Sequence, residues 1–412
     1  MHNIKAVSFD EAIKRAFSLV DTKPKHFEWV STLNANGRIL AENVICQKNL
    51  PSYDNAALDG FAIRHEDCGK TLTIKTTILA GNIVEASLCE NECYKIMTGA
   101  KVPADADTIV PFEACIAYDE FSVQLPLEVK RGNALRLKGE EQSVGNIVLK
   151  EGTRIISSVM AMLASQGISH VKVYRKLTIA IFSTGDELQK PWNHANENEI
   201  YDINATALMG LFSEHGFEAH YGGVIPDNLE DAIIYFEDMK HYDILITSGG
   251  VSMGEADFIE KALLANDYDA LFHGINIKPG KPTMLGIMGK TIVASLPGNP
   301  LAAYVNAFIF LIPLLKKLQG EKKFNFDYVT AVNQETFNVK SGRVNFVLGF
   351  YQNGIFRAFD DNKYGSGMIT PLYYCNAILI TDEMTSVIEM DKKVNIFLFK
   401  APFLENEGLF KN

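Results

Sequence analysis

The middle of the chain alternates short apolar runs with longer stretches that carry apolar residues at helical spacing. Three segments have the length and apolar content of buried strands: residues 177–182, 218–225 and 243–247. Three more have the spacing of amphipathic helices: residues 204–216, 228–240 and 255–266. We expect Asn204 to cap the first of these helices and Gly216 to close it. The alternation predicts an α/β domain over residues 177–320, with a doubly wound parallel sheet.

The segments outside this region have a different character. Short strand-like pieces such as TLTIKTTI and ADTIVPF fill residues 46–145 and predict an inserted β-rich domain. The flanking residues, 1–45 and 146–176, are expected to pack together as a stalk. After the charged stretch KKLQGEKK, residues 321–412 are again rich in strand-like runs. They predict a C-terminal β-barrel, with a sandwich as the alternative.

Polar loops rich in glycine and proline follow the predicted strands of the α/β domain. There are five of them: STGDEL, IPDN, TSGGVSMGEAD, NIKPGKP and SLPGNP. In open sheets of this kind, ligands bind beyond the carboxyl ends of the strands. Five such loops at one sheet edge therefore indicate a ligand site rather than ordinary turns.

The stretch ITSGGVSMGEADF, residues 246–258, is the most unusual of these turns. Its three glycines allow main-chain N–H groups to approach a ligand closely, which suits phosphate at the start of a helix. Glu255 and Asp257 follow and suggest a metal ion or a proton acceptor beside that phosphate. The alternative is a glycine-rich turn whose acids simply complement the helix dipole.

The amino-acid composition argues against some classes of function. A chain of 412 residues, 47% hydrophobic and 22% charged, fits an ordinary globular protein of two to four domains. The formal net charge of −11 argues against a nucleic-acid-binding face. The most apolar run, LAAYVNAFIFLIPLL, contains Asn306 and Pro313 and is too short to span a bilayer, so we expect a buried helix and no membrane association.

Cysteine usage and the N-terminus indicate a cytoplasmic protein. Cys89 and Cys93 are the only close pair among six cysteines, and without a nearby histidine they make a poor zinc motif. We expect reduced thiols. The first residues, MHNIKAVSFDEAIKRAF, are charged and helix-patterned and lack the apolar core of a signal peptide.

Seven motifs in order resemble the MoeA family of molybdopterin molybdenumtransferases, whose animal relative is the gephyrin E domain. They are PSYDNAALDGFAIR, IMTGAKVPADADTIVPFE, RLKGEE, STGDEL, TSGGVSMGEAD, IKPGKP and LPGNP. The resemblance implies four domains, an elongated homodimer, and insertion of molybdate into adenylated molybdopterin with release of AMP. It also implies a divalent cation, usually Mg²⁺.

The resemblance assigns roles to residues of the sheet loops. A phosphate site would be lined by Ser248, Gly249, Gly250 and Ser252, and its nucleotide side would be closed by Pro297, Gly298, Asn299 and Pro300. Asp257 and Asp227 would hold the cation. Glu187 would complete an acidic floor with Asp227. Lys278 and Lys281 would neutralise phosphate or molybdate oxygens, although ordinary surface lysines are the alternative.

Further roles fall outside the α/β domain. Asp59 and Thr98 would approach the substrate from the inserted domain, in the family from the partner subunit. Arg343 and Ser366 match positions associated with oxyanion binding, with a surface arginine and a turn serine as the alternative. The implied catalytic set is thus Asp59, Glu187, Asp227 and Asp257.

The chain departs from the family pattern at several positions. Ala56 and Phe61 stand where relatives usually have serine and tyrosine, Gly274 where a basic residue is common, and Leu348 where arginine is frequent. These departures leave substrate affinity open. Two other functions stay open as alternatives: a scaffold of the gephyrin type, and a molybdopterin adenylyltransferase. The adenylyltransferase is also a possible partner protein.

Overall fold

The computed structural model describes residues 6–82, 87–225, 228–250 and 258–400, which form two compact units. The first unit contains residues 1–28, 37–39 and 173–412, and the second contains residues 29–36 and 40–172. The boundaries proposed for four domains stay a prediction, because this division has two parts.

A six-stranded sheet forms the centre of the first unit. Its strands are β13 (Ile179–Thr184), β16 (Ala219–Ile225), β17 (Ile244–Ser248), β18 (Tyr268–His273), β20 (Met284–Met288) and β21 (Thr291–Leu296). The spatial order is β16-β13-β17-β21-β20-β18. β20 runs in the opposite direction to the other five strands of this sheet. The expectation of a parallel sheet is therefore corrected to a mixed one, because the short turn at Gly289 and Lys290 makes β20 and β21 a hairpin.

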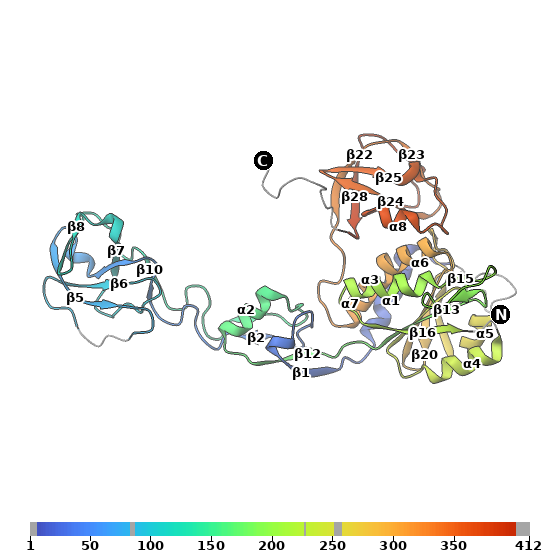
Figure 1. Cartoon of the computed structure of the whole chain (residues 1–412), viewed down its shortest axis with the longest axis horizontal. Coiled ribbons are helices and arrows are strands. Elements are labelled where there is room, and N and C mark those ends of the chain that lie inside the picture. The colour runs from blue at the N-terminus through green and yellow to red at the C-terminus, as the bar shows by residue number, and fades with distance from the viewer. Residues whose placement is uncertain (1–5, 83–86, 226–227, 251–257, 401–412) are drawn as a thin grey trace. The chain divides into compact units, whose positions relative to one another are not determined.

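Helices cover both faces of this sheet, so the prediction of a doubly wound α/β fold is confirmed (Figure 1). One face packs against α1 (Phe9–Asp21), α3 (Ile203–Glu214), α6 (Pro300–Asn306) and α7 (Ile312–Leu318), and the other against α4 (Leu229–Asp238) and α5 (Phe258–Ala265). Alternate strand residues serve the two layers: Ile181 faces the first group of helices and Phe182 the second. Both side chains are buried.

The start of α3 differs from the prediction. The N-cap is Asp202, whose Oδ1 accepts a hydrogen bond from the main-chain N–H of Ala205 at 3.1 Å. Asn204 lies inside the first turn, which leaves its side chain available for another role. The prediction that Gly216 closes α3 is confirmed, since Gly216 has φ +82° and directly follows the C-cap residue His215.

The apolar segment from Pro300 to Leu318 is continuous through a π-helical turn, Ala307–Leu311, that joins α6 to α7. By length and composition alone it could cross a membrane, but 78% of its most apolar window is buried inside the structure. It is a core helix, as the interrupting Asn306 and Pro313 suggested.

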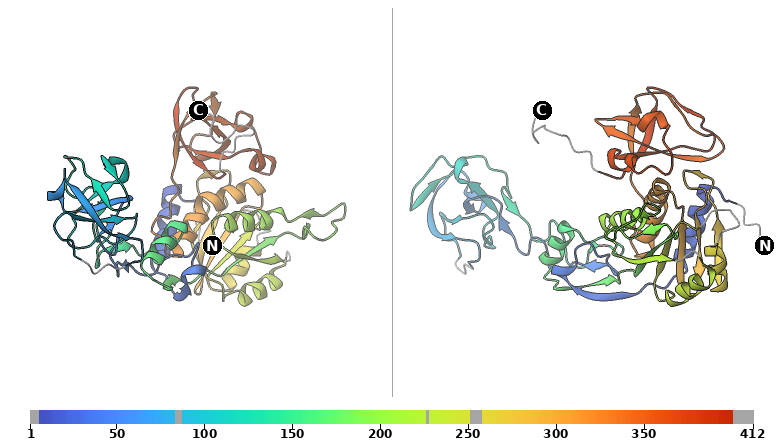
Figure 2. Two further views of the ribbon diagram at one scale, coloured as in Figure 1. Left: turned by 60° about the vertical axis from the view of Figure 1, so that its left-hand side comes forward. Right: turned by 45° about the vertical axis from the view of Figure 1, so that its right-hand side comes forward.

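A closed β-barrel forms the C-terminal part of the first unit (Figure 2). Five strands pair in a ring: β24 (Val344–Gln352), β25 (Ile355–Ala358), β22 (Val329–Asn333), β28 (Lys393–Leu398) and β26 (Ala377–Ile380), which pairs back to β24. The short strand β19 (Ile277–Lys278) adds to the outside of β24. Smaller elements complete the unit: β14 (Leu188–Gln189), β15 (Ile200–Tyr201), β23 (Phe337–Asn338), β27 (Val387–Ile388) and α8 (Thr370–Tyr374).

The second unit is β-rich, as predicted for the inserted region. Its main sheet contains β4 (Gly60–Ile63), β5 (Thr71–Ile78), β6 (Glu92–Ile96), β7 (Thr108–Pro111), β8 (Ala117–Tyr118) and β9 (Ser122–Gln124). Apolar clusters cover both faces, with Phe61 in one and Ala62 in the other. Shorter elements are β2 (Val44–Ile45), β3 (Asn55–Ala56), β10 (Leu135–Arg136), β11 (Ile147–Leu149) and α2 (Ser157–Ser165). A separate two-stranded sheet pairs β1 (Phe27–Ser31) with β12 (His170–Tyr174).

Candidate active site

A cavity of about 850 Å³ lies beyond the carboxyl ends of β13, β17 and β21. Its walls come from the loops that the sequence singled out, and the described lining residues that were predicted are Glu187, Ser248, Gly249, Gly250, Gly298, Asn299 and Pro300. Three parallel strands end at the same edge, so their loops converge there. The predicted ligand edge thus coincides with a real cavity.

The Gly249–Gly250 turn packs directly on the end of β13. Both residues have positive φ, +93° and +63°. A Cβ on Gly249 would lie 2.7 Å from Thr184 Oγ1, and one on Gly250 would lie 2.5 Å from Ile259 Cγ1. The turn therefore needs glycine for its conformation and for the close approach of its neighbours. The main-chain N–H of Gly249 donates to the Leu296 carbonyl oxygen at 3.1 Å, which ties the turn to the end of β21.

Asn204 ties two of the cavity loops together. Its Nδ2 donates to Ser248 Oγ at 2.8 Å and to the Gly298 carbonyl oxygen at 2.7 Å. Ser248 Oγ donates in turn to the Pro297 carbonyl at 3.2 Å. The buried Ser248 hydroxyl is thus committed to bracing the loops. The sequence analysis missed this role of Asn204, and the one signal for it was the earlier capping residue Asp202, two positions before it.

Asp202 contributes a buried carboxylate next to the cavity. Its Oδ1 accepts from Ser183 Oγ at 2.8 Å as well as from the helix start, whereas its buried Oδ2 has no hydrogen-bond partner within 3.5 Å among the described residues. Burial raises the pKa of the nearby Tyr221 phenol, and the Asp202 carboxylate adds to this effect. An unpartnered buried carboxylate oxygen is costly unless a ligand or water completes it.

The barrel reaches the cavity through Ser366 and Gly367. Ser366 Oγ accepts a hydrogen bond from Asn299 Nδ2 at 2.9 Å, and its carbonyl accepts from the Leu301 N–H at 3.2 Å. Gly367 is itself a lining residue. The structure therefore brings Ser366 to the predicted nucleotide side, where it holds Asn299 in place.

The predicted basic residues lie elsewhere in the unit. Lys278, Lys281 and Arg343 are not among the described residues that line the cavity. Strand pairing explains this: β18 is separated from β21 by β20, so the loop after β18 lies two strand spacings away. Lys278 instead pairs with Asn345 of the barrel, which brings the NIKPGKP and SGRVNF segments side by side.

Asp59 and Thr98 form a pair in the second unit. Asp59 Oδ1 accepts from both the main-chain N–H and the hydroxyl of Thr98, each at 2.7 Å. These two bonds, the main-chain one first, hold the pKa of the exposed Asp59 carboxyl below its usual range. The two motifs that carry them, 39 positions apart, are thus joined by direct contact.

Three predicted site residues, Asp227, Ser252 and Asp257, lie outside the described residues. Within the described ranges, no group of three or more His, Cys, Asp or Glu side chains could hold a metal ion. The carboxylates among the described lining residues are Glu187 and Asp202.

The departures from the family pattern have structural reasons. Ala56, Phe61 and Leu348 are fully buried, so their apolar side chains pack the cores of their units. Gly274 has φ +101°, and a Cβ there would lie 3.1 Å from the Cβ of Ala6. A side chain at position 274 would therefore strain the main chain.

Comparison with known proteins shows to which family the chain belongs. A relative from Haemophilus influenzae, named molybdopterin molybdenumtransferase, is 32% identical over 384 residues, which cover 90% of this chain and 94% of the relative. The chain belongs to the MoeA family. Residues 7–167 match the family described as MoeA N-terminal region (domain I and II), and residues 180–317 match the one described as Probable molybdopterin binding domain.

Other members of the MoeA family agree with this assignment. The Bacillus subtilis molybdopterin molybdenumtransferase is 29% identical over 96% of this chain and 94% of the relative. The crystal structure of the molybdopterin biosynthesis MoeA protein from Pyrococcus horikoshii OT3 matches with a TM-score of 0.83 and 28% identity, covering 96% of this chain and all of that chain. The family resemblance and the multidomain α/β and β fold predicted from the sequence are confirmed.

Proposed function

We propose that this protein is a molybdopterin molybdenumtransferase, a transferase of molybdenum cofactor biosynthesis that inserts molybdate into adenylated molybdopterin and releases AMP. The observation that carries the proposal is the Gly249–Gly250 turn, packed on Thr184 at the edge of a cavity, in a chain of the MoeA family. A glycine turn of this form lets the main chain approach a phosphate group closely.

The charged residues in the described lining of the cavity are the carboxylates Glu187 and Asp202, so an adenylate would bind there together with a cation. The pyrophosphate would accept from the glycine turn, and the loop from Gly298 to Pro300, held by Asn204 and Ser366, would contact the nucleotide. Release of AMP breaks one P–O bond of the pyrophosphate, with water supplying the oxygen that replaces it. The exposed carboxylate of Glu187 is the described group best able to accept a proton from that water.

A divalent cation is part of the proposal. Mg²⁺ bound by Asp227 and Asp257 would neutralise charge on the pyrophosphate oxygens. Lys278, Lys281 and Arg343 would act on molybdate from the β19–β24 segment, whose strand pairing brings cations of two loops together. These ligand sets rest on the family resemblance.

The reaction itself provides the test. Purified protein should release AMP from adenylated molybdopterin only when molybdate and Mg²⁺ are both present. Synthesis of adenylated molybdopterin from ATP, without molybdate-dependent AMP release, would identify an adenylyltransferase instead and reject the proposal.

We propose further that the protein is a cytoplasmic homodimer in which Asp59 and Thr98 serve the cavity of the partner subunit. Free cysteines throughout the described chain are consistent with a reducing compartment. Asp59→Asn and Asp257→Asn should each inactivate the dimer. In a mixed dimer one site receives both changes and the other none, so doubly tagged mixed dimers should recover about half of the wild-type activity. Folded but inactive mixed dimers would contradict a shared site.

A further inference from the structure

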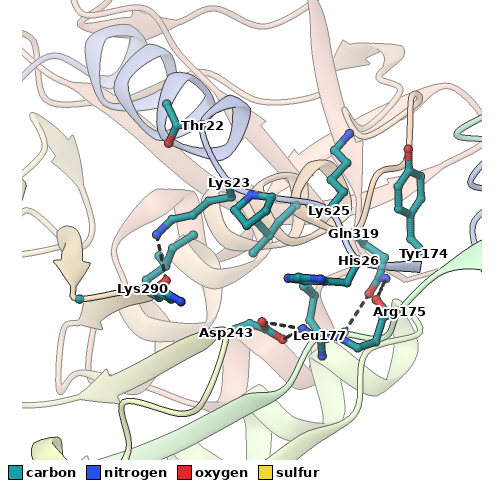
Figure 3. Close-up of a pocket in the computed structure, with 14 residues that line it drawn as sticks. Thr22, Lys23, Lys25, His26, Tyr174, Arg175, Leu177, Asp243, Lys290 and Gln319 are labelled. Carbon is teal, nitrogen blue, oxygen red and sulfur yellow. Dashed lines mark hydrogen bonds and ion pairs between the residues drawn. The ribbon is translucent and has the colours of Figure 1, made fainter. Parts of the chain in front are cut away.

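A second cavity lies at the opposite ends of the same three strands. It has a volume of about 390 Å³ and is lined by residues next to the amino ends of β13, β17 and β21: Leu177, Asp243, Gly289, Lys290 and Ile292. The segment from Thr22 to His26, the pair Tyr174 and Arg175, and Leu318 and Gln319 complete the wall (Figure 3). All of these residues belong to the first unit.

Cations outnumber acids around this cavity. Lys23, Lys25, Arg175 and Lys290 face one carboxylate, Asp243. Arg175 donates to both oxygens of Asp243, at 2.8 and 3.0 Å, and Thr178 donates to the same carboxylate. The negative charge of Asp243 is therefore already satisfied. In the part of the chain that the structure describes, Lys23, Lys25 and Lys290 form no ion pair within 4.0 Å, on a protein whose formal net charge is −11.

Lys23 is the partly buried lysine of this cavity. Its Nζ donates to the Lys290 carbonyl oxygen at 2.9 Å, and Figure 3 shows its side chain extended along the cavity toward Lys290. Burial lowers the pKa of the Lys23 ammonium because the cavity removes part of its hydration. A partly desolvated ammonium that is paired only with a neutral carbonyl gains from an anion placed beside it.

Part of the remaining wall is apolar and aromatic. Tyr174 and Ile292 are buried, and Leu177 and Leu318 are half-buried. Lys25 Nζ lies 5.2 Å from the centre of the Tyr174 ring, so the cation and the ring mark one end of the cavity together. An inorganic ion alone would leave this apolar surface uncovered.

We propose that this cavity binds a small organic phosphate, whose anionic group contacts Lys23 and Lys290 and whose planar apolar body packs on Tyr174 and Leu177. Lysine is a common phosphate ligand because it supplies a compact charge. The volume lies within the range of small-molecule sites. The cavity is separate from the candidate active site, because each lies at a different end of β13, β17 and β21. The inference does not depend on the proposed catalytic function.

Phenyl phosphate is a minimal probe of this chemistry, since it joins a phosphate group to one planar ring. Calorimetric titration of the full chain at low salt should show phenyl phosphate binding at least about tenfold more tightly than either inorganic phosphate or phenol. Lys23→Met should weaken phenyl phosphate binding by about tenfold or more. Lys290→Met, which keeps the main-chain carbonyl, should also weaken phenyl phosphate binding. If Lys23→Met does not fold, Lys290→Met takes its place in the test.

Lys14→Met is the matched control. It removes one positive charge from an exposed position of α1, the helix that ends just before Lys23, and should leave the affinity within about twofold. Phenyl phosphate should also protect Lys23, but not Lys14, from acylation measured by peptide mass spectrometry. Unchanged binding in Lys23→Met or absence of protection would overturn the proposal. Loss of binding in Asn299→Ala, with Lys23→Met unaffected, would place the anion in the candidate active site and overturn it equally.

Discussion

The two ends of the central sheet, each proposed to bind an anion, are built differently. At the carboxyl ends of β13, β17 and β21, a glycine turn packs on the sheet, and Asn204 and Ser366 hold the loops in place. At the amino ends of the same strands, lysine side chains surround an apolar wall. Main-chain donors cannot rotate away from a ligand, whereas lysine side chains can.

This difference suggests a division of roles. Fixed donors suit a reaction, because reacting groups must be held within a fraction of an ångström. Flexible lysines suit reversible binding of a ligand whose orientation matters less. We therefore expect small changes of shape to abolish function at the carboxyl end, and changes of charge to matter more at the amino end.

The largest expected effect comes from adding one methyl group to a glycine turn. In Gly250→Ala the new Cβ would lie 2.5 Å from Ile259 Cγ1 and 2.9 Å from Thr184 Oγ1, so the turn must shift. We expect AMP release to fall by about a hundredfold or more, with a loss of unfolding free energy of roughly 1–3 kcal/mol. Single-turnover AMP release and chemical denaturation measure the two quantities.

Gly289→Ala is the control at the other end of the sheet. Gly289 has nearly the same φ, +61° against +63°, but no atom lies within 4 Å of its Cβ position. This variant should lose about 1 kcal/mol of unfolding free energy, from main-chain strain alone. Its rate of AMP release should stay within about twofold of the wild-type rate. Equal loss of activity in both variants would mean that strain alone, and not the packed turn, is responsible.

A smaller effect is expected for Asn204→Asp, which keeps the shape but removes both donors and places an oxygen against the Gly298 carbonyl. AMP release should fall about 10- to 100-fold, with roughly 1–3 kcal/mol lost in stability. Asn266→Asp is the matched control, since Asn266 Nδ2 also donates to two carbonyls, of Ile233 and Ala262, but away from the cavity. It should lose stability while turnover stays near the wild-type value, and a similar fall in turnover would contradict the bracing role of Asn204.

The change with pH in the contribution of Lys23 to stability should be a smaller effect than those of the glycine and asparagine variants. Burial lowers its pKa below the ordinary 10.5, so between the two values the unfolded chain binds more protons than the folded one. The contribution of Lys23 to stability therefore rises with pH in the interval just below 10.5. The stability of the wild type relative to Lys23→Met, measured by urea unfolding at pH 8 and at pH 10, should increase. A constant difference would show that Lys23 titrates as an ordinary surface lysine.

The smallest effect concerns the exposed pair in the second unit. Thr98→Val removes the hydroxyl bond to Asp59 but keeps the main-chain bond, so the pKa of Asp59 should rise toward its usual value. A depressed carboxyl pKa contributes stability that is present at neutral pH and is lost as pH falls through it, so the small loss of stability in Thr98→Val should appear near neutral pH and vanish in acid. Carboxyl titration by NMR checks the shift, and an unchanged pKa would leave the main-chain bond as its whole cause.

The sequence predicted the central layers well because their residues repeat with a local period. Runs such as 244–248 and the spacing within α3 identify strand and helix without knowledge of distant contacts. The loops at the carboxyl ends were equally visible, since the conformations at Gly249 and Gly250 require glycine itself. The segment MLGIMGKTIVAS predicts a hairpin, which requires β20 to run antiparallel to β21, but the sheet as a whole was predicted to be parallel.

Other features depend on contacts between distant segments. Asn204 was interpreted as a cap because its partners, Ser248 and Gly298, lie 44 and 94 positions away. The cavity at the amino ends draws its charges from Lys23, Arg175 and Lys290, none of which stands in a distinctive motif. Family resemblance could suggest Asp59 and Thr98, but their direct hydrogen bond emerged only from the folded chain.

The most direct test of the division between the two ends is single-turnover AMP release by three proteins under the same conditions: the wild type, Gly250→Ala and Lys23→Met. With adenylated molybdopterin, molybdate and Mg²⁺, the wild type and Lys23→Met should release AMP at rates within about twofold of each other. Gly250→Ala should be slower by about a hundredfold. Full activity of Gly250→Ala together with loss of activity in Lys23→Met would place the chemistry at the amino ends of the strands and contradict the account.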